Sequence, residues 1–394
     1  MTTRTVEQHA QHIAELLAPL HTRPGEEIPL GEALGRALAA DVHSPVDLPL
    51  FRNSQMDGYA VDAASITTVP VMLPVRGVIA AGPAEPVTHL PGTAYRIMTG
   101  APVPPGADAI VPVEDTVTSD GEVRIEKTRS AGEFVRERGS DVRAGTLLLA
   151  AGSLLAARHI AVLAAVGLQR VSVRPRPRVA VITTGAELVD AGSALRPGQI
   201  YDSNGIALAS SARANGAEVV SIARSTDDPA EFRTLLAEAV LTADVVLTSG
   251  GVSMGDFEVV KETLSPLGAQ FAHVAMQPGG PQGTAVVNGV PVLNFPGNPV
   301  STLVSFEIFA RPDIRRAAGL PPTEAVEGPL AAPLTSVRGK RQFLRARRTD
   351  TGVELVAGPG SHLVAAMAWA DVLVDVPADV TALDAGQLVK VIPL

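Results

Sequence analysis

The chain has 394 residues, of which 46% are hydrophobic and 3% aromatic, with a mean hydropathy of +0.23 and a formal net charge of −9. This length exceeds a single compact core, so two to four domains are expected. The negative charge argues against a general nucleic-acid binder, and the absence of cysteine excludes disulfides, Cys-based zinc sites and thiolate nucleophiles. No apolar stretch approaches the roughly 20 residues of a membrane span, and the N-terminal segment lacks a secretory signal pattern. We therefore expect a cytoplasmic protein that does not span a membrane.

The first part of the chain changes character twice. Residues 6–40 are predicted to be helical, with a break at "HTRPGEEIP". From about residue 45 to residue 140, short apolar runs are punctuated by Gly and Pro, which is typical of strands and turns. A second helical stretch, "LLAARHIAVLAAVG", is followed by the Pro- and Arg-rich linker "VSVRPRPR".

From Arg178 onward, strands are expected to alternate with helices. The runs "VAVITTG", "EVVSIARS", "DVVLTSGG" and "PVLNFPG" are rich in Val, Ile and Leu, and helical spacing lies between them. This alternation predicts an α/β domain with an open, doubly wound parallel sheet. The chain then returns to short strands, which predict a small C-terminal β domain.

Five loops of this α/β segment are rich in small or turn-forming residues, and three of them carry acidic residues. They are "TTGAELVD", "STDDP", "TSGGVSMGD", "QPGGPQG" and "FPGNPVS". Ligands of open α/β sheets bind beyond the carboxyl ends of the strands, so these loops predict a site. Glycines let backbone N–H groups face an oxyanion, and a hard cation such as Mg²⁺ explains carboxylates beside an anion. The candidate carboxylates are Glu187, Asp227, Asp228, Asp256 and Glu258.

Other interpretations of each loop stay open at this point. A single loop of this kind is more often an ordinary turn or helix cap than a ligand site. The sequence has no G-x-x-x-x-G-K-[ST], no G-x-G-x-x-G at the first helix and no H-E-x-x-H. The set of loops therefore predicts metal-assisted chemistry on a phosphorylated substrate without one of the common nucleotide motifs.

Seven segments resemble one enzyme family in order and spacing. They are "SQMDGYAV", "MTGAPVPPGADAIVP", "GSDV", "TTGAELV", "GQIYDSN", "TSGGVSMG" and "FPGNPVS". Together they are similar to the molybdopterin molybdenumtransferases, the bacterial molybdenum-insertion enzymes related to the E domain of gephyrin. The resemblance covers nearly the whole chain and weakens over the C-terminal 70 residues or so.

The resemblance implies a multidomain α/β plus β architecture. An elongated helical domain over residues 1–45 and 141–174 is expected, with an inserted β domain over 46–140. An α/β molybdopterin-binding domain over 175–322 and a C-terminal β-barrel over 323–394 follow. A homodimer is implied, as is a reaction in which molybdenum from molybdate enters adenylylated molybdopterin and AMP is released with Mg²⁺. A separate adenylyltransferase is expected to supply the substrate.

The resemblance also assigns roles to residues of this sequence. Catalytic roles are implied for Asp57, Asp141, Glu187 and Asp227. Substrate contacts are implied for Thr99, Gly250, Gly251, Ser253, Pro296, Pro299 and Ser361. The metal ligands are expected to be Glu187, Asp227 and Glu258.

Two departures from the family pattern concern charged residues, the first changing the length of a side chain and the second removing positive charge. Glu258 stands where an Asp is usual, and Gln277 and Gly280 replace both lysines of the usual K-P-G-K-P. Because lysine is a compact cation suited to oxyanions, we expect weaker oxyanion binding unless Arg338, Arg341 or Arg345 compensates. The missing lysines favour one alternative, a non-catalytic or weakly active paralogue that binds or scaffolds the cofactor. A second alternative is a related molybdopterin adenylyltransferase, which shares the α/β domain.

Overall fold

The computed structural model describes residues 2–83, 85, 87–252 and 258–394. The chain forms two compact units. Unit 1 comprises residues 1–27, 35–39 and 172–394, and unit 2 comprises residues 28–34 and 40–171. Within the described residues, no helix is both long enough and apolar enough to cross a membrane.

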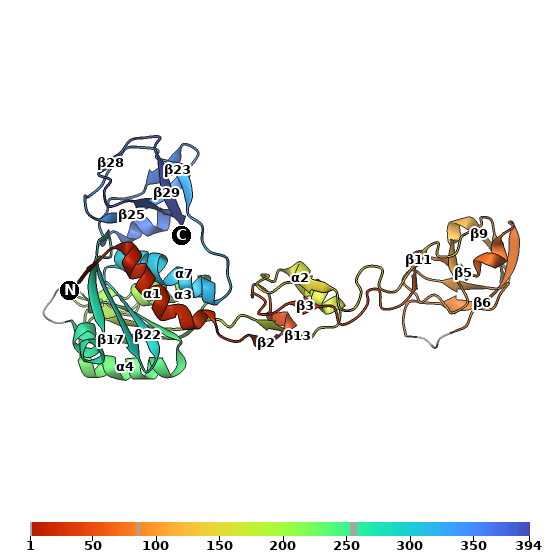
Figure 1. Cartoon of the computed structure of the whole chain (residues 1–394), viewed down its shortest axis with the longest axis horizontal. Coiled ribbons are helices and arrows are strands. Elements are labelled where there is room, and N and C mark those ends of the chain that lie inside the picture. The colour runs from red at the N-terminus through yellow and green to blue at the C-terminus, as the bar shows by residue number, and fades with distance from the viewer. Residues whose placement is uncertain (1, 84, 86, 253–257) are drawn as a thin grey trace. The chain divides into compact units, whose positions relative to one another are not determined.

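A seven-stranded sheet forms the centre of unit 1 (Figure 1). Its order is β1 (Thr2–Arg4), β19 (Gln270–Val274), β21 (Pro281–Val287), β22 (Val290–Phe295), β18 (Val245–Ser249), β14 (Arg178–Thr184) and β17 (Glu218–Ser225). Strand β14 pairs in parallel with β17 and β18, and β18 pairs in parallel with β22. These four strands are the ones predicted from the sequence, and their parallel arrangement is confirmed.

The other side of the sheet differs from the prediction. Strand β21 runs antiparallel to both β19 and β22, so the sheet is mixed rather than parallel throughout. The cause is a two-residue turn between β21 and β22, where Asn288 has φ 51° and Gly289 has φ 82°. Positive φ at both positions is the geometry of a tight hairpin turn, for which Asn-Gly is a strong sequence signal.

Helices cover both faces of the sheet. They are α1 (Val6–His21), α3 (Asn204–Ala214), α4 (Pro229–Thr242), α5 (Val259–Leu264), α6 (Pro299–Ser305) and α7 (Arg311–Ala317), with a π-helical turn, η5 (Phe306–Ala310), between the last two. Along β14, Val179 and Val181 join the core beneath α1, α3, α6 and α7, whereas Ala180 and Ile182 join the core beneath α4 and α5. This alternation follows from the two-residue period of a strand and confirms a sheet wound on both sides.

The N-terminal helical prediction is correct only in part. Helix α1 begins at a capping box formed by Thr5 and Gln8, and it buries Ile13, Leu17 and Leu20 against unit 1. The expected second helix over residues 30–40 is wrong, because that segment has one short 3-10 turn, η1 (Leu30–Glu32). Gly35 adopts φ 73°, a left-handed conformation that an α-helix cannot continue through. Residues 141–174 likewise contain a single nine-residue helix, α2 (Ala157–Ala165), so the expected helical domain is mostly not helical.

The C-terminal part of unit 1 is a β structure around its own apolar cluster. Its sheet contains β20 (Met276–Gln277), β25 (Arg341–Thr349), β27 (Val372–Val376), β29 (Leu388–Pro393) and β23 (Val326–Pro329), with β26 (Gly352–Leu355) beside β25. Strand β20 comes from the α/β part and pairs in parallel with β25, placing Gln277 opposite Gln342. The two parts of unit 1 are therefore joined by backbone pairing at one of the predicted ligand loops. A closed barrel stays a prediction.

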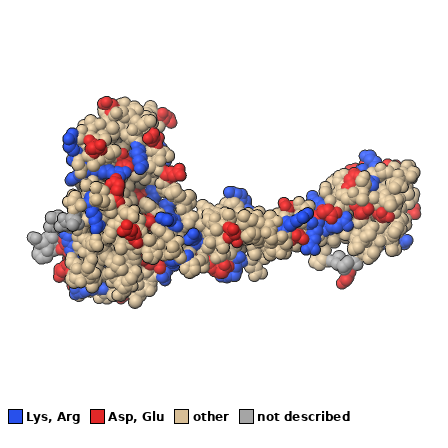
Figure 2. Space-filling view, viewed as in Figure 1, with Lys and Arg blue, Asp and Glu red and all other residues tan. Residues whose placement is uncertain are grey.

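Unit 2 is built around a six-stranded sheet. Its order is β8 (Ala109–Pro112), β5 (Gly58–Val61), β7 (Ala94–Ile97), β6 (Val71–Ile79), β10 (Glu122–Ile125) and β9 (Thr116–Ser119). Short pairs extend it along the chain, β4 (Asn53–Ser54) with β11 (Val135–Arg136) and β3 (Val42–His43) with β12 (Leu147–Leu149). Charges of both signs are interspersed on the face shown in Figure 2, and ion pairs such as Arg52–Glu137 and Arg138–Asp47 belong to this unit.

Candidate functional site

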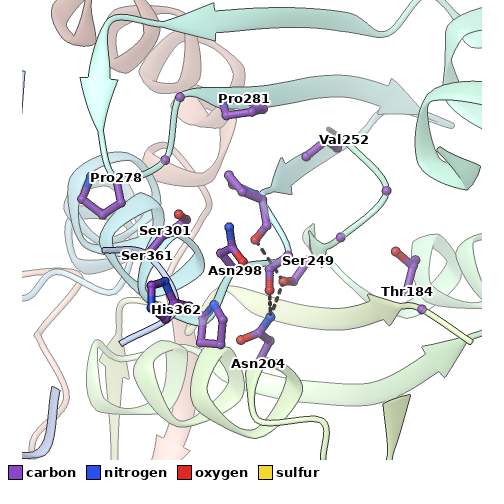
Figure 3. Close-up of a pocket in the computed structure, with 18 of the residues that line it drawn as sticks. Thr184, Asn204, Ser249, Val252, Pro278, Pro281, Asn298, Ser301, Ser361 and His362 are labelled. Atoms are coloured by element: carbon purple, nitrogen blue, oxygen red, sulfur yellow. Dashed lines mark hydrogen bonds between the residues drawn. The ribbon is translucent and has the colours of Figure 1, made fainter. Parts of the chain in front are cut away.

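A cavity of about 830 Å³ opens in unit 1 where β14, β18 and β22 end. Its volume lies within the usual range for small-molecule sites. The loops after these strands form one wall, and the 273–281 and 359–362 segments form another. Figure 3 shows Thr184 and Ser249 at the strand ends, Pro278 on the other side of the cavity, and Ser361 and His362 beside Asn298. Residues from the α/β part and the C-terminal part of unit 1 therefore share one cavity.

Two glycines let the strand-end loops approach each other closely. Gly250 has φ 100° and Gly251 has φ 65°, conformations that residues with a side chain rarely adopt. A Cβ atom at Gly250 would lie 2.6 Å from the Thr184 carbonyl oxygen, and one at Gly251 would lie 2.6 Å from Cγ2 of Val260. Both glycines line the cavity together with Pro296 and Pro299, and their contact with a substrate stays a prediction. Ser253 and Asp256 lie outside the described residues.

Asn204, the first residue of α3, ties two of these loops together. Its side-chain amide donates to Ser249 Oγ at 2.9 Å and to the Gly297 carbonyl oxygen at 2.7 Å (Figure 3). Ser249 Oγ also lies 3.0 Å from Thr302 Oγ1, which donates to the Pro296 carbonyl oxygen at 2.6 Å. The loops after β18 and β22 are thus held by a shared network of hydrogen bonds, whose Ser249 and Thr302 members are buried.

Asp202 and Asn204 were not singled out individually from the sequence. Asp202 accepts hydrogen bonds from Thr183 Oγ1 at 2.6 Å and from the Gly205 N–H at 3.0 Å, and it lines the cavity. The available signal was "YDSN", in which Asp and Asn precede an apolar helical run. Such residues are typical of helix starts, which concealed their position at the cavity.

Three predicted carboxylates, those of Glu187, Asp227 and Glu258, line the cavity. The Asp227 carboxylate accepts a hydrogen bond from the Ala186 N–H at 3.2 Å, which draws its loop toward the one that carries Glu187. Asp228, grouped with them in the sequence, is instead the N-cap of α4 and accepts the Ala230 N–H at 2.8 Å. The neighbouring residues Asp227 and Asp228 therefore have different roles, since the first lines the cavity and the second caps a helix.

The described residues contain no preformed metal site with three protein ligands. No three His, Cys, Asp or Glu side chains among them lie close enough together to hold an ion, so Glu187, Asp227 and Glu258 do not form the three-ligand cluster that was expected. Magnesium commonly takes one or two carboxylates and completes its shell with substrate oxygens and water. Glu187 and Asp227, on adjoining loops of one cavity, fit that kind of site.

The segment that departs from the family pattern lies against the C-terminal sheet. Gln277 accepts a hydrogen bond from Gln342 Nε2 at 2.6 Å. Arg341, an expected source of compensating charge, is paired with Asp375 and Glu7. The cation that lines the cavity is Lys340, whose ammonium group forms no ion pair or hydrogen bond with any other described residue. Sequence reasoning chose the neighbouring arginines and missed this lysine.

Arg345 has a structural role beside the cavity. It is 2% exposed, and its guanidinium donates to the carbonyl oxygens of Leu363 at 2.6 Å, Gly360 at 3.1 Å and Gly358. Burial lowers the pKa of this arginine from its ordinary value. These bonds hold the loop that brings Ser361 into the cavity, and the Ser361 carbonyl oxygen in turn accepts the Val300 N–H at 3.2 Å.

The remaining predicted residues belong to unit 2. Asp57 accepts hydrogen bonds from the Thr99 N–H at 2.7 Å and from Thr99 Oγ1 at 2.9 Å. These bonds, the backbone one foremost, hold the pKa of the Asp57 carboxyl below its ordinary value. Asp141 lies on another segment of the unit, where its N–H donates to the Leu48 carbonyl oxygen at 2.9 Å. The structure thus brings Asp57 and Thr99 into direct contact.

Comparison with known proteins accounts for most of the chain. Residues 4–167 match the MoeA N-terminal region (domain I and II), residues 180–316 match the probable molybdopterin binding domain, and residues 327–394 match the MoeA C-terminal region (domain IV). The molybdopterin molybdenumtransferase 2 of Mycobacterium tuberculosis (strain H37Rv) is 45% identical over 403 residues, covering 98% of this chain and 99% of the relative. The chain belongs to the MoeA family.

Other members of the MoeA family agree with this assignment. The molybdopterin molybdenumtransferase of Nostoc sp. (strain PCC 7120) is 41% identical over 326 residues, covering 80% of this chain and 75% of the relative. A crystal structure of a molybdopterin biosynthesis MoeA protein from Pyrococcus horikoshii superposes with a TM-score of 0.83 at 34% identity, covering 100% of this chain and 99% of that one. The MoeA-family resemblance noted in the sequence is therefore confirmed, and it extends through the C-terminal region.

Proposed function

We propose that this protein is a molybdopterin molybdenumtransferase, which inserts molybdenum from molybdate into adenylylated molybdopterin with release of AMP. The observation that carries the proposal is the composition of the unit 1 cavity. Glycine-rich strand-end loops, the carboxylates of Glu187 and Asp227, and the ammonium group of Lys340 all line it. An adenylylated pterin with an oxyanion co-substrate requires these three kinds of group together.

Each group has a role in the proposed reaction. The left-handed turn at Gly250 and Gly251 brings the loop backbone to the cavity, where a phosphate group can approach it closely because no side chain intervenes. The Gly250 N–H itself donates to the Phe295 carbonyl oxygen at 3.1 Å. Glu187 and Asp227 would hold Mg²⁺, which neutralises phosphate charge when it is bound. Lys340 supplies positive charge for an oxyanion, and Pro296, Pro299 and Ser361 form the cavity wall around it.

Further features of the proposal rest on the family resemblance. Asp57, Thr99 and Asp141 are assigned to the reaction by their motifs, and the protein is proposed to act as a cytoplasmic homodimer. Its substrate would be supplied by a separate molybdopterin adenylyltransferase. Static light scattering at micromolar concentration should give twice the 40.7 kDa chain mass, and a mass equal to that of one chain would contradict the dimer.

The alternative of a non-catalytic paralogue draws on the loss of lysine at Gln277 and Gly280. Lys340 weighs against it, since a cation is present in the cavity despite that loss. The alternative of an adenylyltransferase predicts that AMP is incorporated into molybdopterin rather than released.

One assay separates these alternatives. The purified protein is incubated with adenylylated molybdopterin, Mg²⁺ and molybdate, and nucleotides are followed by chromatography. Molybdate-dependent AMP release supports the proposed function. No release at any molybdate concentration contradicts it and favours the non-catalytic paralogue. In a parallel reaction with ATP and molybdopterin, formation of adenylylated pterin favours the adenylyltransferase.

A further inference from the structure

The imidazole of His273 occupies the space that a side chain at position 280 would need. A Cβ atom built on Gly280 would lie 2.8 Å from Cε1 of His273 and 3.3 Å from each ring nitrogen. The backbone of the two segments is fixed in this register, because His273 pairs with Pro281 and the Val274 N–H donates to the Gly280 carbonyl oxygen at 2.7 Å. The ring therefore lies directly against the glycine.

Gly280 is explained by this contact and not by its backbone conformation. Most cavity glycines, such as Gly250 and Gly251, adopt positive φ, but Gly280 does not. A residue with a side chain could adopt the same backbone without the strain of a left-handed conformation. A side chain at position 280 would instead require the His273 ring to move, so the residue at position 280 and the position of this ring depend on each other.

The His273 ring is also available to a ligand. It lines the same cavity as Lys340, and neither of its ring nitrogens forms a hydrogen bond with the described part of the chain. An imidazole can donate a hydrogen bond in either protonation state. A donor at the cavity wall without a protein partner suits the oxygen of an oxyanion, which carries only acceptors.

We propose that His273 contacts the oxyanion at this wall, in place of the side chain that Gly280 lacks. The ligand class is a tetrahedral oxyanion, which is molybdate in the proposed reaction. The identity of the oxyanion as molybdate rests on the proposed function. The contact between His273 and Gly280 does not depend on it. It changes the expected effect of restoring a lysine at position 280, since a lysine there displaces the ring before it adds a charge.

Calorimetric titration with molybdate, alongside the molybdate dependence of AMP release, tests the proposal in four proteins. They are the wild type, His273→Ala, Gly280→Lys and the double variant. Loss of one hydrogen bond to a charged group predicts about tenfold weaker molybdate binding by His273→Ala. Gly280→Lys alone should give no tighter binding than the wild type. The double variant should recover most of the loss, because the lysine then enters a vacated space.

Two further variants separate an oxyanion contact from a packing effect. His273→Gln keeps a neutral donor and should bind molybdate more tightly than His273→Ala, although both lose the ring. His362→Ala removes another cavity histidine, and its effect should add to that of Gly280→Lys without coupling. The proposal would be overturned if the effects of His362→Ala and Gly280→Lys on molybdate affinity were as non-additive as those of His273→Ala and Gly280→Lys.

The remaining outcomes distinguish this inference from the proposed function. The inference is overturned if a folded His273→Ala protein binds molybdate with unchanged affinity, or if Gly280→Lys alone binds molybdate more tightly than the wild type. If AMP is still released in that case, the proposed function stands. Binding of molybdate that depends on His273, without AMP release, supports the inference and contradicts the function. Absence of molybdate binding by the wild type, measured with adenylylated molybdopterin present, overturns the inference.

Discussion

Asn204 and Ser249 are joined by a hydrogen bond of 2.9 Å between the side-chain amide nitrogen and the hydroxyl oxygen. The same amide reaches the Gly297 carbonyl oxygen at 2.7 Å, so one side chain links the start of α3 to the loops after β18 and β22. The position of these loops fixes the wall of the cavity. Asn204 is therefore a positioning residue in our account.

Asn204→Asp should weaken substrate binding and lower stability. The substitution keeps the size of the side chain but replaces the donor with a carboxylate facing a carbonyl oxygen. Loss of the two hydrogen bonds donated by this half-buried side chain predicts about 1–3 kcal/mol in the free energy of unfolding. The Michaelis constant for the pterin substrate should rise, since the loops are no longer held together.

Asn215→Ala is the matched control for this prediction. Asn215 caps the other end of α3 and donates to the Ser211 carbonyl oxygen at 2.8 Å. It does not line the cavity, so its substitution should lower stability without changing the Michaelis constant. Equal kinetic effects in the two variants would contradict a specific role for Asn204.

Glu187→Ala and Asp227→Ala should each remove Mg²⁺-dependent turnover. Loss of a preorganised electrostatic group predicts a fall of about 100-fold or more in kcat. The thermal midpoints should stay close to that of the wild type. Asp228→Ala is the control, because loss of the α4 N-cap should cost about 1 kcal/mol of stability and leave the Mg²⁺ dependence unchanged. Full turnover in either cavity variant would exclude that residue from the site.

Arg345→Lys should loosen the loop that carries Ser361. A lysine keeps the charge but cannot reach the three carbonyl oxygens that the guanidinium fork serves. The unpaired carbonyls predict a loss of about 2–4 kcal/mol in the free energy of unfolding. Arg348→Lys, on the exposed part of β25, should change stability little. Denaturant unfolding of the two variants measures the difference, and equal stability would contradict the assigned role of Arg345.

His9 should make the protein sensitive to moderate acid. Its ring is 1% exposed, packs edge-on against Phe309 and leaves Nε2 without a hydrogen-bond partner among the described residues. Burial, with help from the charge of Arg4, lowers the pKa of His9 to about 3. Because the folded-state pKa lies below the unfolded value, the unfolded state binds more protons and stability falls as pH drops below about 6.5.

The size of the His9 effect can be measured by denaturant unfolding at several pH values. The linkage predicts a loss of about 2 kcal/mol between pH 7 and about pH 5 from this residue alone. His9→Leu should remove that part of the pH dependence. His43→Gln, at an exposed position of β3, should leave it unchanged. An unaltered pH profile in His9→Leu would show that His9 is not the source.

The sequence predicted the strands that carry the site because buried parallel strands leave strong local signals. "VAVITTG" and "DVVLTSGG" are apolar runs that end in small residues, and both end at the cavity. The antiparallel strand β21 was missed although Asn288 and Gly289 mark its turn. The prediction of a helix after residue 30 was wrong because it followed the helical spacing of apolar residues and neglected Gly31 and Gly35, which disfavour a helix.

The composition of the site was less predictable than its location. Glycines and carboxylates stand in loops with clear patterns, so Gly250 and Asp227 could be chosen from the sequence. Lys340 and His273 come from segments with no motif, and they reach the cavity only because β20 pairs with β25 and β19 pairs with β21. Such contacts between distant segments depend on tertiary structure, which local patterns do not encode.

The most direct test of the central claim is a single-turnover reaction in which pterin-bound molybdenum and AMP are both quantified. The wild-type protein is mixed in excess with adenylylated molybdopterin, and molybdate and Mg²⁺ are added together. Our account predicts that one molybdenum atom enters the pterin for each AMP released, and that both products decline together in Asp227→Ala. AMP release without molybdenum in the pterin, or molybdenum insertion that persists in Asp227→Ala, would contradict it.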